Sequence, residues 1–215
     1  MAIIRSLKQY CSPMNALPGI EFWFDFASTY SYPAAMRVEK LAGSQGCFVQ
    51  WRPFLLGAIF QKQGWNDSPF NIYPAKGRYM WRDLERLCAS LEIPFRKPSQ
   101  FPRNGLTAAR VACANAGAVW IALFVRRVYE ANFAHDLDIA EPSVLIDCLD
   151  RLVEDRGAVL ATARGNEAKS CLRCNTERAV ELGIFGAPIT VVGQELFWGN
   201  DRLEAALAWQ RAGRD

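Results

Sequence analysis

Apolar residues recur at every second position in the first regular segment of the chain, at Ile20, Phe22, Phe24 and Phe26. This period of two predicts a strand with one buried face. Residues 28–33 (STYSYP) then supply hydroxyls typical of helix starts and a Pro that a first helical turn tolerates, and apolar residues continue at helical spacing to Ala42. Residues 47–51 (CFVQW) predict a second strand. The chain therefore opens with a β-α-β unit.

Helical periodicity replaces the strand patterns from residue 57 to about residue 183. Apolar residues follow helical spacing in four segments, residues 78–91, 107–133, 142–152 and 156–182. Residues 64–77, which precede the first of them, are rich in Gly, Pro and Asn and predict an irregular loop. This part of the chain is interpreted as a helical insertion.

Strand patterns return near the C-terminus. Residues 189–192 and 195–198 predict a hairpin with a two-residue turn, and residues 201–209 predict a closing helix. If both ends of the chain pack together, their strands form a four-stranded mixed sheet. The predicted fold is α/β and thioredoxin-like, with a large helical insertion. The predicted parts are an N-terminal extension (residues 1–19), a thioredoxin-like domain (residues 20–57 plus 184–215) and the helical insertion domain (residues 58–183).

Composition places the chain among ordinary globular proteins. Hydrophobic residues make up 51% and charged residues 22% of the 215 positions, without repeats, which excludes disordered and fibrous classes. The 25 Lys and Arg residues against 22 Asp and Glu give a net charge of +3. This charge is too weak and too scattered to indicate a nucleic-acid partner.

Membrane and export signals do not emerge from the pattern. The longest charge-free apolar run, residues 111–125, is shorter than the roughly 20 residues of a spanning helix and predicts a buried helix instead. Near the start, Arg5, Lys8 and Gln9 interrupt the apolar run that a secretory signal needs. We therefore expect a cytoplasmic protein without a membrane segment.

The cysteines and the single histidine offer little support for a metal site or a redox site. Seven scattered cysteines indicate reduced intracellular thiols rather than a disulfide framework. Cys171 and Cys174 form a CxxC, but it lies inside a helical pattern, away from the strand-to-helix junctions where thiol pKa values fall, and we interpret it as structural. His135 is interpreted as an exposed loop residue, and no metal is expected.

Four motifs match one family in the right order and at about the right spacing. They are residues 24–32 (FDFASTYSY), 76–80 (KGRYM), 185–190 (FGAPIT) and 197–203 (FWGNDRL). On these motifs the chain, from residue 20 to the C-terminus, resembles the 2-hydroxychromene-2-carboxylate isomerase and kappa-class glutathione transferase family, the glutathione-using, DsbA-like branch of the thioredoxin superfamily. It departs from the family at Thr29, where Pro is usual, and at Pro33.

The resemblance implies a glutathione-dependent isomerase that acts on a conjugated aromatic substrate, with a homodimer as the expected assembly. Glutathione would be the cofactor, because its thiolate adds to the substrate and leaves again. One alternative is a kappa-type transferase or peroxidase, in which the thiolate attacks an electrophile and is not returned. Another is a protein that binds glutathione without catalysis.

Ser28 is the catalytic candidate. By the resemblance it sits where a thioredoxin-type enzyme has the first Cys of its redox pair, and Ser31 sits at the second. Without sulfur at either place the site cannot exchange a disulfide itself. A hydroxyl near a helix N-terminus can instead donate to a bound thiolate, which the helix dipole also favours. The alternative is that Ser28 only caps the helix.

The remaining site residues are implied by the resemblance. Ala187 and Pro188 match the superfamily's cis-proline, and a cis bond would leave the Ala187 N–H and C=O free to pair with glutathione in strand-like fashion. Asn200 and Asp201 would bind the γ-glutamyl end. Alternatively, Asn200 is an N-cap and Asp201 a dipole-favoured acid, and both roles can coexist.

The insertion is expected to complete the site. Lys76 matches the family lysine that meets the glycyl carboxylate, and Asn66 matches its loop asparagine, with Asn71 as the rival for that place. Four further residues are weaker candidates for the walls of a pocket for an aromatic carboxylate: Arg52, Arg78, Tyr79 and Trp81.

Overall fold

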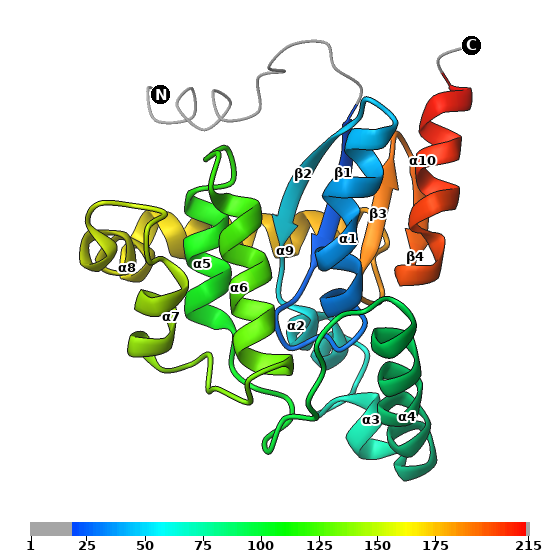
Figure 1. Cartoon of the computed structure of the whole chain (residues 1–215), viewed down its shortest axis with the longest axis horizontal. Helices are drawn as coiled ribbons and strands as arrows, with labels where there is room; N and C mark the ends of the chain where they lie inside the picture. Colours follow the sequence, from blue (N-terminus) through cyan, green and yellow to red (C-terminus); the bar gives the residue numbers. More distant parts are fainter. Residues whose placement is uncertain (1–18, 214–215) are drawn as a thin grey trace.

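A four-stranded mixed sheet forms the centre of the computed structural model, which describes residues 19–213 (Figure 1). Its strands are β1 (Gly19–Phe24), β2 (Phe48–Pro53), β3 (Ile189–Val192) and β4 (Glu195–Trp198), in the order β2-β1-β3-β4. β1 pairs with β2 in parallel and with β3 in antiparallel fashion, and β3 and β4 form the hairpin. The predicted sheet, built from both ends of the chain, is confirmed. Apart from Gly19, the proposed N-terminal extension lies outside the described residues.

Helices cover both faces of this sheet. α1 (Ser31–Ser44) and α10 (Leu203–Ala212) pack against each other and against the strands, while α9 (Asn166–Glu181) crosses the opposite face (Figure 1). The alternation along β1 explains the two layers, because Phe22 and Phe24 join the core on the α1 side, whereas Trp23 joins a second core with Ala179 of α9. β1 is thus buried on both faces.

Apart from α9, the insertion divides into two groups of helices, one below the sheet in the view of Figure 1 and one beside it. One group holds α2 (Leu56–Lys62), α3 (Pro69–Ile72) and α4 (Pro74–Ser90). The other holds α5 (Leu106–Ala114), α6 (Ile121–Phe133), α7 (Pro142–Cys148) and α8 (Arg156–Arg164), with α5 and α8 packed on α9.

Three predictions of local structure are corrected. The helix expected over residues 107–133 is broken between α5 and α6, where the side-chain amide of Asn115 donates to the Val111 carbonyl at 2.8 Å and ends the helix. The helix expected over residues 156–182 is broken at Gly165, between α8 and α9. The expected loop over residues 64–77 contains α3 and the first turn of α4, because a Pro begins each of these helices.

The cysteine prediction is wrong for one pair. Cys113 on α5 and Cys171 on α9 are joined by a disulfide, with their Cα atoms 6.2 Å apart. The cause is the packing of α5 against α9, which brings together residues 58 positions apart. Cys174, one turn further along α9, is an exposed free thiol. The expected position of the CxxC inside a helix is confirmed.

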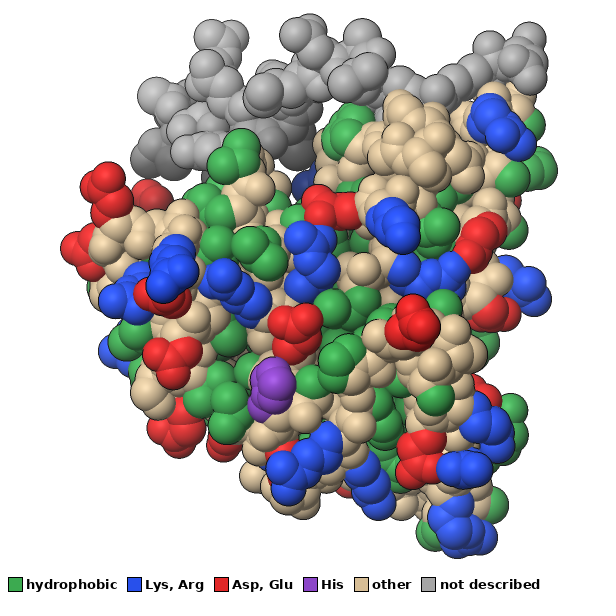
Figure 2. Space-filling view, viewed as in Figure 1, with side chains coloured by type: hydrophobic (Ala, Val, Ile, Leu, Met, Phe, Trp, Pro, Cys, Tyr) green, Lys and Arg blue, Asp and Glu red, His purple; other side chains and the backbone are tan. Residues whose placement is uncertain are grey.

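The surface mixes charges of both signs. Lys, Arg, Asp and Glu side chains are interspersed over the face shown in Figure 2. His135 is exposed on a bend after α6, as predicted. Between residues 19 and 213, no helix combines the length and the apolar character needed to cross a membrane.

Candidate functional site

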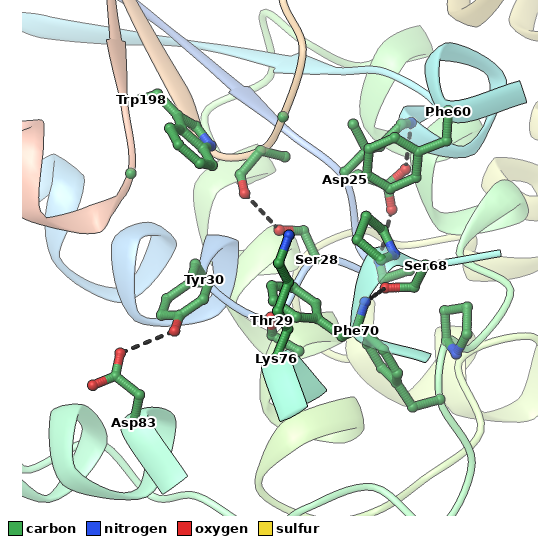
Figure 3. A pocket seen from close by; sticks show the side chains of 18 of the residues that line it. Asp25, Ser28, Thr29, Tyr30, Phe60, Ser68, Phe70, Lys76, Asp83 and Trp198 are labelled. Atoms are coloured by element: carbon green, nitrogen blue, oxygen red, sulfur yellow. Dashed lines mark hydrogen bonds between the residues drawn. The ribbon is translucent and has the colours of Figure 1, made fainter. Parts of the chain in front are cut away.

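A cavity of about 1400 Å³ opens between the thioredoxin-like part and the group of helices α2–α4 (Figure 3). Its lining comes from the β1–α1 turn, α2 to α4, the cis-proline loop before β3, and the turn after β4. Aromatic rings make up much of the wall, and two of them, Phe185 and Trp198, pack edge to face. These rings are about half exposed. The cavity therefore has an apolar wall with a few polar groups, as small-molecule sites usually do.

Ser28 lies on this cavity, in the turn between β1 and α1 (Figure 3). Its N–H donates to the Asp25 carbonyl at 2.9 Å, and its Oγ donates to the Ala187 carbonyl at 2.9 Å. α1 begins only at Ser31, and no side chain caps its N-terminus. The alternative that Ser28 merely caps the helix is therefore wrong.

The Ala187–Pro188 peptide bond is cis, as predicted. The expectation that the Ala187 C=O is free is corrected, because this carbonyl accepts the Ser28 hydroxyl. Pro188, predicted as a site residue, does not line the cavity, and its carbonyl accepts from Gly199 N–H at 3.0 Å. This bond joins the cis-proline loop to the turn that precedes Asn200.

Asn200 and Asp201 both line the cavity, in a short 3-10 helix (Asn200–Arg202) before α10. Asn200 is buried, and its side-chain oxygen accepts from the Arg37 guanidinium at 3.2 Å. The NH₂ group of this amide is not used in that bond. Asp201 is exposed, with Arg202 at 3.8 Å. The N-cap alternative for Asn200 is wrong, because Gly199 holds that position. Asp201 does lie in the first turn.

The insertion brings Lys76 and Asn66 to the cavity. Lys76 is in the first turn of α4, where its ammonium lies 4.7 Å from the centre of the Tyr73 ring. Asn71, the rival of Asn66, does not line the cavity. Its side-chain amide donates to the Asp67 carboxylate and to the Phe101 carbonyl.

Of the four weaker wall candidates only Tyr79 lines the cavity. Helical geometry explains the difference on α4, because Lys76, Tyr79 and Asp83 share one face while Arg78 lies off it. Trp81 packs against Phe101 instead. Arg52 forms an ion pair with Glu21 on the neighbouring strand at 2.9 Å.

Sequence reasoning missed a contact that closes one side of the cavity. The Tyr30 hydroxyl donates to the Asp83 carboxylate at 2.9 Å, which ties the start of α1 to α4 (Figure 3). Burial, together with this carboxylate, raises the pKa of Tyr30, so the phenol stays protonated and keeps donating. A tyrosine in the matched motif was the only available signal, and its partner lies 53 positions away.

A second missed residue is Asp25, whose carboxylate lies under the turn that carries Ser28. It accepts from Ala27 N–H at 2.7 Å and from Leu56 N–H at 2.8 Å. Burial raises the pKa of this carboxyl group, and the two backbone hydrogen bonds oppose that rise. An acid at the end of a buried strand is the signal that could have pointed to it.

The family follows from a match along nearly the whole chain. A family model of the DSBA-like thioredoxin domain matches residues 19–208. The chain belongs to this family. Among its relatives, the 2-hydroxychromene-2-carboxylate isomerase of Sphingobium xenophagum is 30% identical over 187 residues, which are 86% of this chain and 94% of that protein. The glutathione S-transferase kappa 1 of Homo sapiens is 28% identical, over 89% of this chain and 90% of that protein.

Solved structures agree with these sequence relatives. A structure of 2-hydroxychromene-2-carboxylate isomerase matches with a TM-score of 0.80 at 27% identity, over 92% of this chain and 99% of that chain. The predicted thioredoxin-like, DsbA-like fold and the stated resemblance are thereby confirmed. Because the relatives are named isomerases and transferases, an enzyme is supported.

Proposed function

We propose that this chain is a glutathione-dependent isomerase of the 2-hydroxychromene-2-carboxylate type. One observation carries the proposal: the Ser28 hydroxyl faces the cis-proline loop inside an aromatic-walled cavity that also holds Lys76 and Asp201. A serine in place of a cysteine removes disulfide chemistry but retains a donor for a thiolate.

The residues of the cavity fit the tripeptide in charge and in hydrogen-bonding type. Asp201 supplies a carboxylate for the γ-glutamyl ammonium, and the Asn200 amide a donor for its carboxylate. Lys76 supplies a cation for the glycyl carboxylate, and Asn66 also lines the cavity. Ala187 offers its main chain to the cysteinyl residue between them.

Ser28 has one hydroxyl hydrogen, which in this structure points to the Ala187 carbonyl. Donation to a thiolate therefore requires rotation of the hydroxyl away from that carbonyl. The same rotation frees the Ala187 carbonyl to accept from the main chain of a bound peptide. One side-chain movement would thus complete both the thiolate site and the strand-like recognition site.

Bound glutathione would supply a thiolate that adds reversibly to a conjugated substrate, so that a double bond becomes a single bond that can rotate. The chain's own contribution is the Ser28 donor, which favours the thiolate over the thiol, and the aromatic walls, which keep water from the substrate. The substrate would be a small aromatic carboxylate.

The kappa-type transferase is the second candidate, because kappa transferases match the chain over nearly the same length as the isomerases. Assay of the purified protein with glutathione and a hydroxychromene carboxylate separates the functions. Substrate turnover with constant free thiol supports the isomerase, and loss of thiol supports the transferase. Binding of glutathione without either indicates a non-catalytic protein. A cytoplasmic location and a homodimer belong to the same proposal, and the homodimer rests on the family resemblance.

A further inference from the structure

Asp25 is a partly buried carboxylate to which the proposed mechanism gives no role. It lies between the main cavity and a smaller one of about 510 Å³ behind the β1–α1 turn, and it lines both. Its two oxygens accept from two backbone N–H groups, those of Ala27 and Leu56. Placing a carboxylate here has a desolvation cost that an apolar residue at the end of the strand would avoid.

The two hydrogen bonds of the carboxylate join two separate segments of the cavity wall. Ala27 immediately precedes Ser28, and Leu56 is the first residue of α2, whose Phe60 lines the cavity. The Asp25 carbonyl also holds this turn, because it accepts from Ser28 N–H at 2.9 Å and from the Tyr129 hydroxyl at 2.8 Å. Two successive N–H groups of the turn, those of Ala27 and Ser28, are thus both bonded to Asp25.

The carboxyl group of Asp25 satisfies both N–H groups, one with each oxygen. An asparagine side chain has the same shape but a single acceptor oxygen, so its NH₂ group would face either Ala27 N–H or Leu56 N–H. One of the two bonds would be lost and a donor left facing a donor. The arrangement therefore depends on Asp at this position and not on its size.

We propose that Asp25 is a positioning residue whose carboxylate clamps the Ser28 turn to the start of α2 and so sets where the Ser28 hydroxyl meets the thiol. This proposal rests on the proposed function. It differs from a purely structural role in one respect: the effect of Asp25 on the bound thiol should pass through Ser28.

The test is a cycle of variants read by the thiolate absorbance of bound glutathione against pH. Asp25→Asn should raise the pKa of the bound thiol toward that in Ser28→Ala and reduce turnover roughly 10- to 100-fold, the scale for a misplacement near 1 Å. Glutathione affinity should change less than about threefold. In the double variant, Asp25→Asn should add almost nothing to Ser28→Ala. Independent, additive effects, or a parental titration in Asp25→Asn, would overturn the proposal.

A second pair of variants decides the matter if Asp25→Asn does not fold. Leu56→Pro removes the N–H that Asp25 holds, at a first helical position where Pro is favoured, and Leu55 before it already has an extended backbone (φ −102°, ψ 99°). Leu56→Ala keeps the N–H and is the matched control for the lost side chain. We expect a raised thiol pKa in Leu56→Pro relative to Leu56→Ala, and equal titrations would contradict the clamp. If the parent itself does not bind glutathione, the proposed function fails first and the clamp fails with it.

Discussion

The Ser28 hydroxyl donates to the Ala187 carbonyl across 2.9 Å, although 159 positions of the chain separate the two residues. Ser28 follows the first strand and Ala187 precedes the third, and the antiparallel pairing of β1 with β3 brings both to the same end of the sheet. The bond thus closes the site between the two ends of the thioredoxin-like part. In this state, therefore, the Ser28 hydroxyl hydrogen and the Ala187 carbonyl are hydrogen-bonded to each other.

Asp201 provides a prediction on affinity. Asp201→Asn should weaken glutathione binding by roughly 1.5 to 3 kcal/mol, the range for hydrogen bonds to charged groups. Its effect on stability should be small, because the side chain is exposed. Calorimetric titration and a melting curve measure the two effects, with Glu154→Gln, an exposed acid away from the cavity, as the control. Unchanged affinity with a lowered melting temperature would indicate that Asp201 serves only the helix.

A matched pair of variants distinguishes the roles of Asn66 and Asn71 in glutathione binding. Asn66→Ala should weaken glutathione binding, because Asn66, like Lys76, lines the cavity. Asn71→Ala should leave affinity within about twofold, since its amide is already bonded to Asp67 and Phe101. Equilibrium binding of glutathione to both variants is the measurement. The opposite order of effects would assign the role to Asn71.

The Cys113–Cys171 disulfide should support stability and not catalysis. It joins α5 to α9, far along the chain from the Ser28 turn. Replacing Cys171 and Cys174 together by Ser should lower the free energy of unfolding by roughly 2 to 4 kcal/mol, as loss of a disulfide does. Turnover should stay within a few-fold. Denaturant unfolding and a steady-state assay provide the two readings.

Cys174→Ser alone is the control for that double variant, because Cys174 is exposed and outside the disulfide. It should unfold like the parent. Loss of activity in the double variant, with fold and glutathione affinity intact, would contradict the structural interpretation of the CxxC.

Local patterns were sufficient for the sheet. The period-two run predicted β1, and two short strand segments on either side of a two-residue turn predicted the β3–β4 hairpin. The cis bond at Pro188 and the position of Ser28 came from matched motifs and not from periodicity. Helix α2, by contrast, was missed, because only Ile59 in it is buried and the apolar period is too short to detect.

Long-range contacts account for the rest of what the sequence left open. The choice between Asn66 and Asn71 depends on the hydrogen bonds that the Asn71 amide donates to Asp67 and Phe101. The disulfide depends on the packing of α5 on α9. The Tyr30–Asp83 hydrogen bond depends on the position of α4 relative to the start of α1. Such pairings have no signature within a window of neighbouring residues. They follow only once the helices are placed.

We expect Ser28 to stabilise the glutathione thiolate, and the thiolate absorbance of the bound tripeptide, followed against pH, measures this effect. In Ser28→Ala we expect the pKa of bound glutathione to rise and turnover at neutral pH to fall by roughly 10²-fold or more, as loss of one preorganised donor does. Glutathione affinity should change little, because Ala187, Asn200, Asp201 and Lys76 remain in place. A variant with the parental thiolate titration and parental turnover would contradict the account.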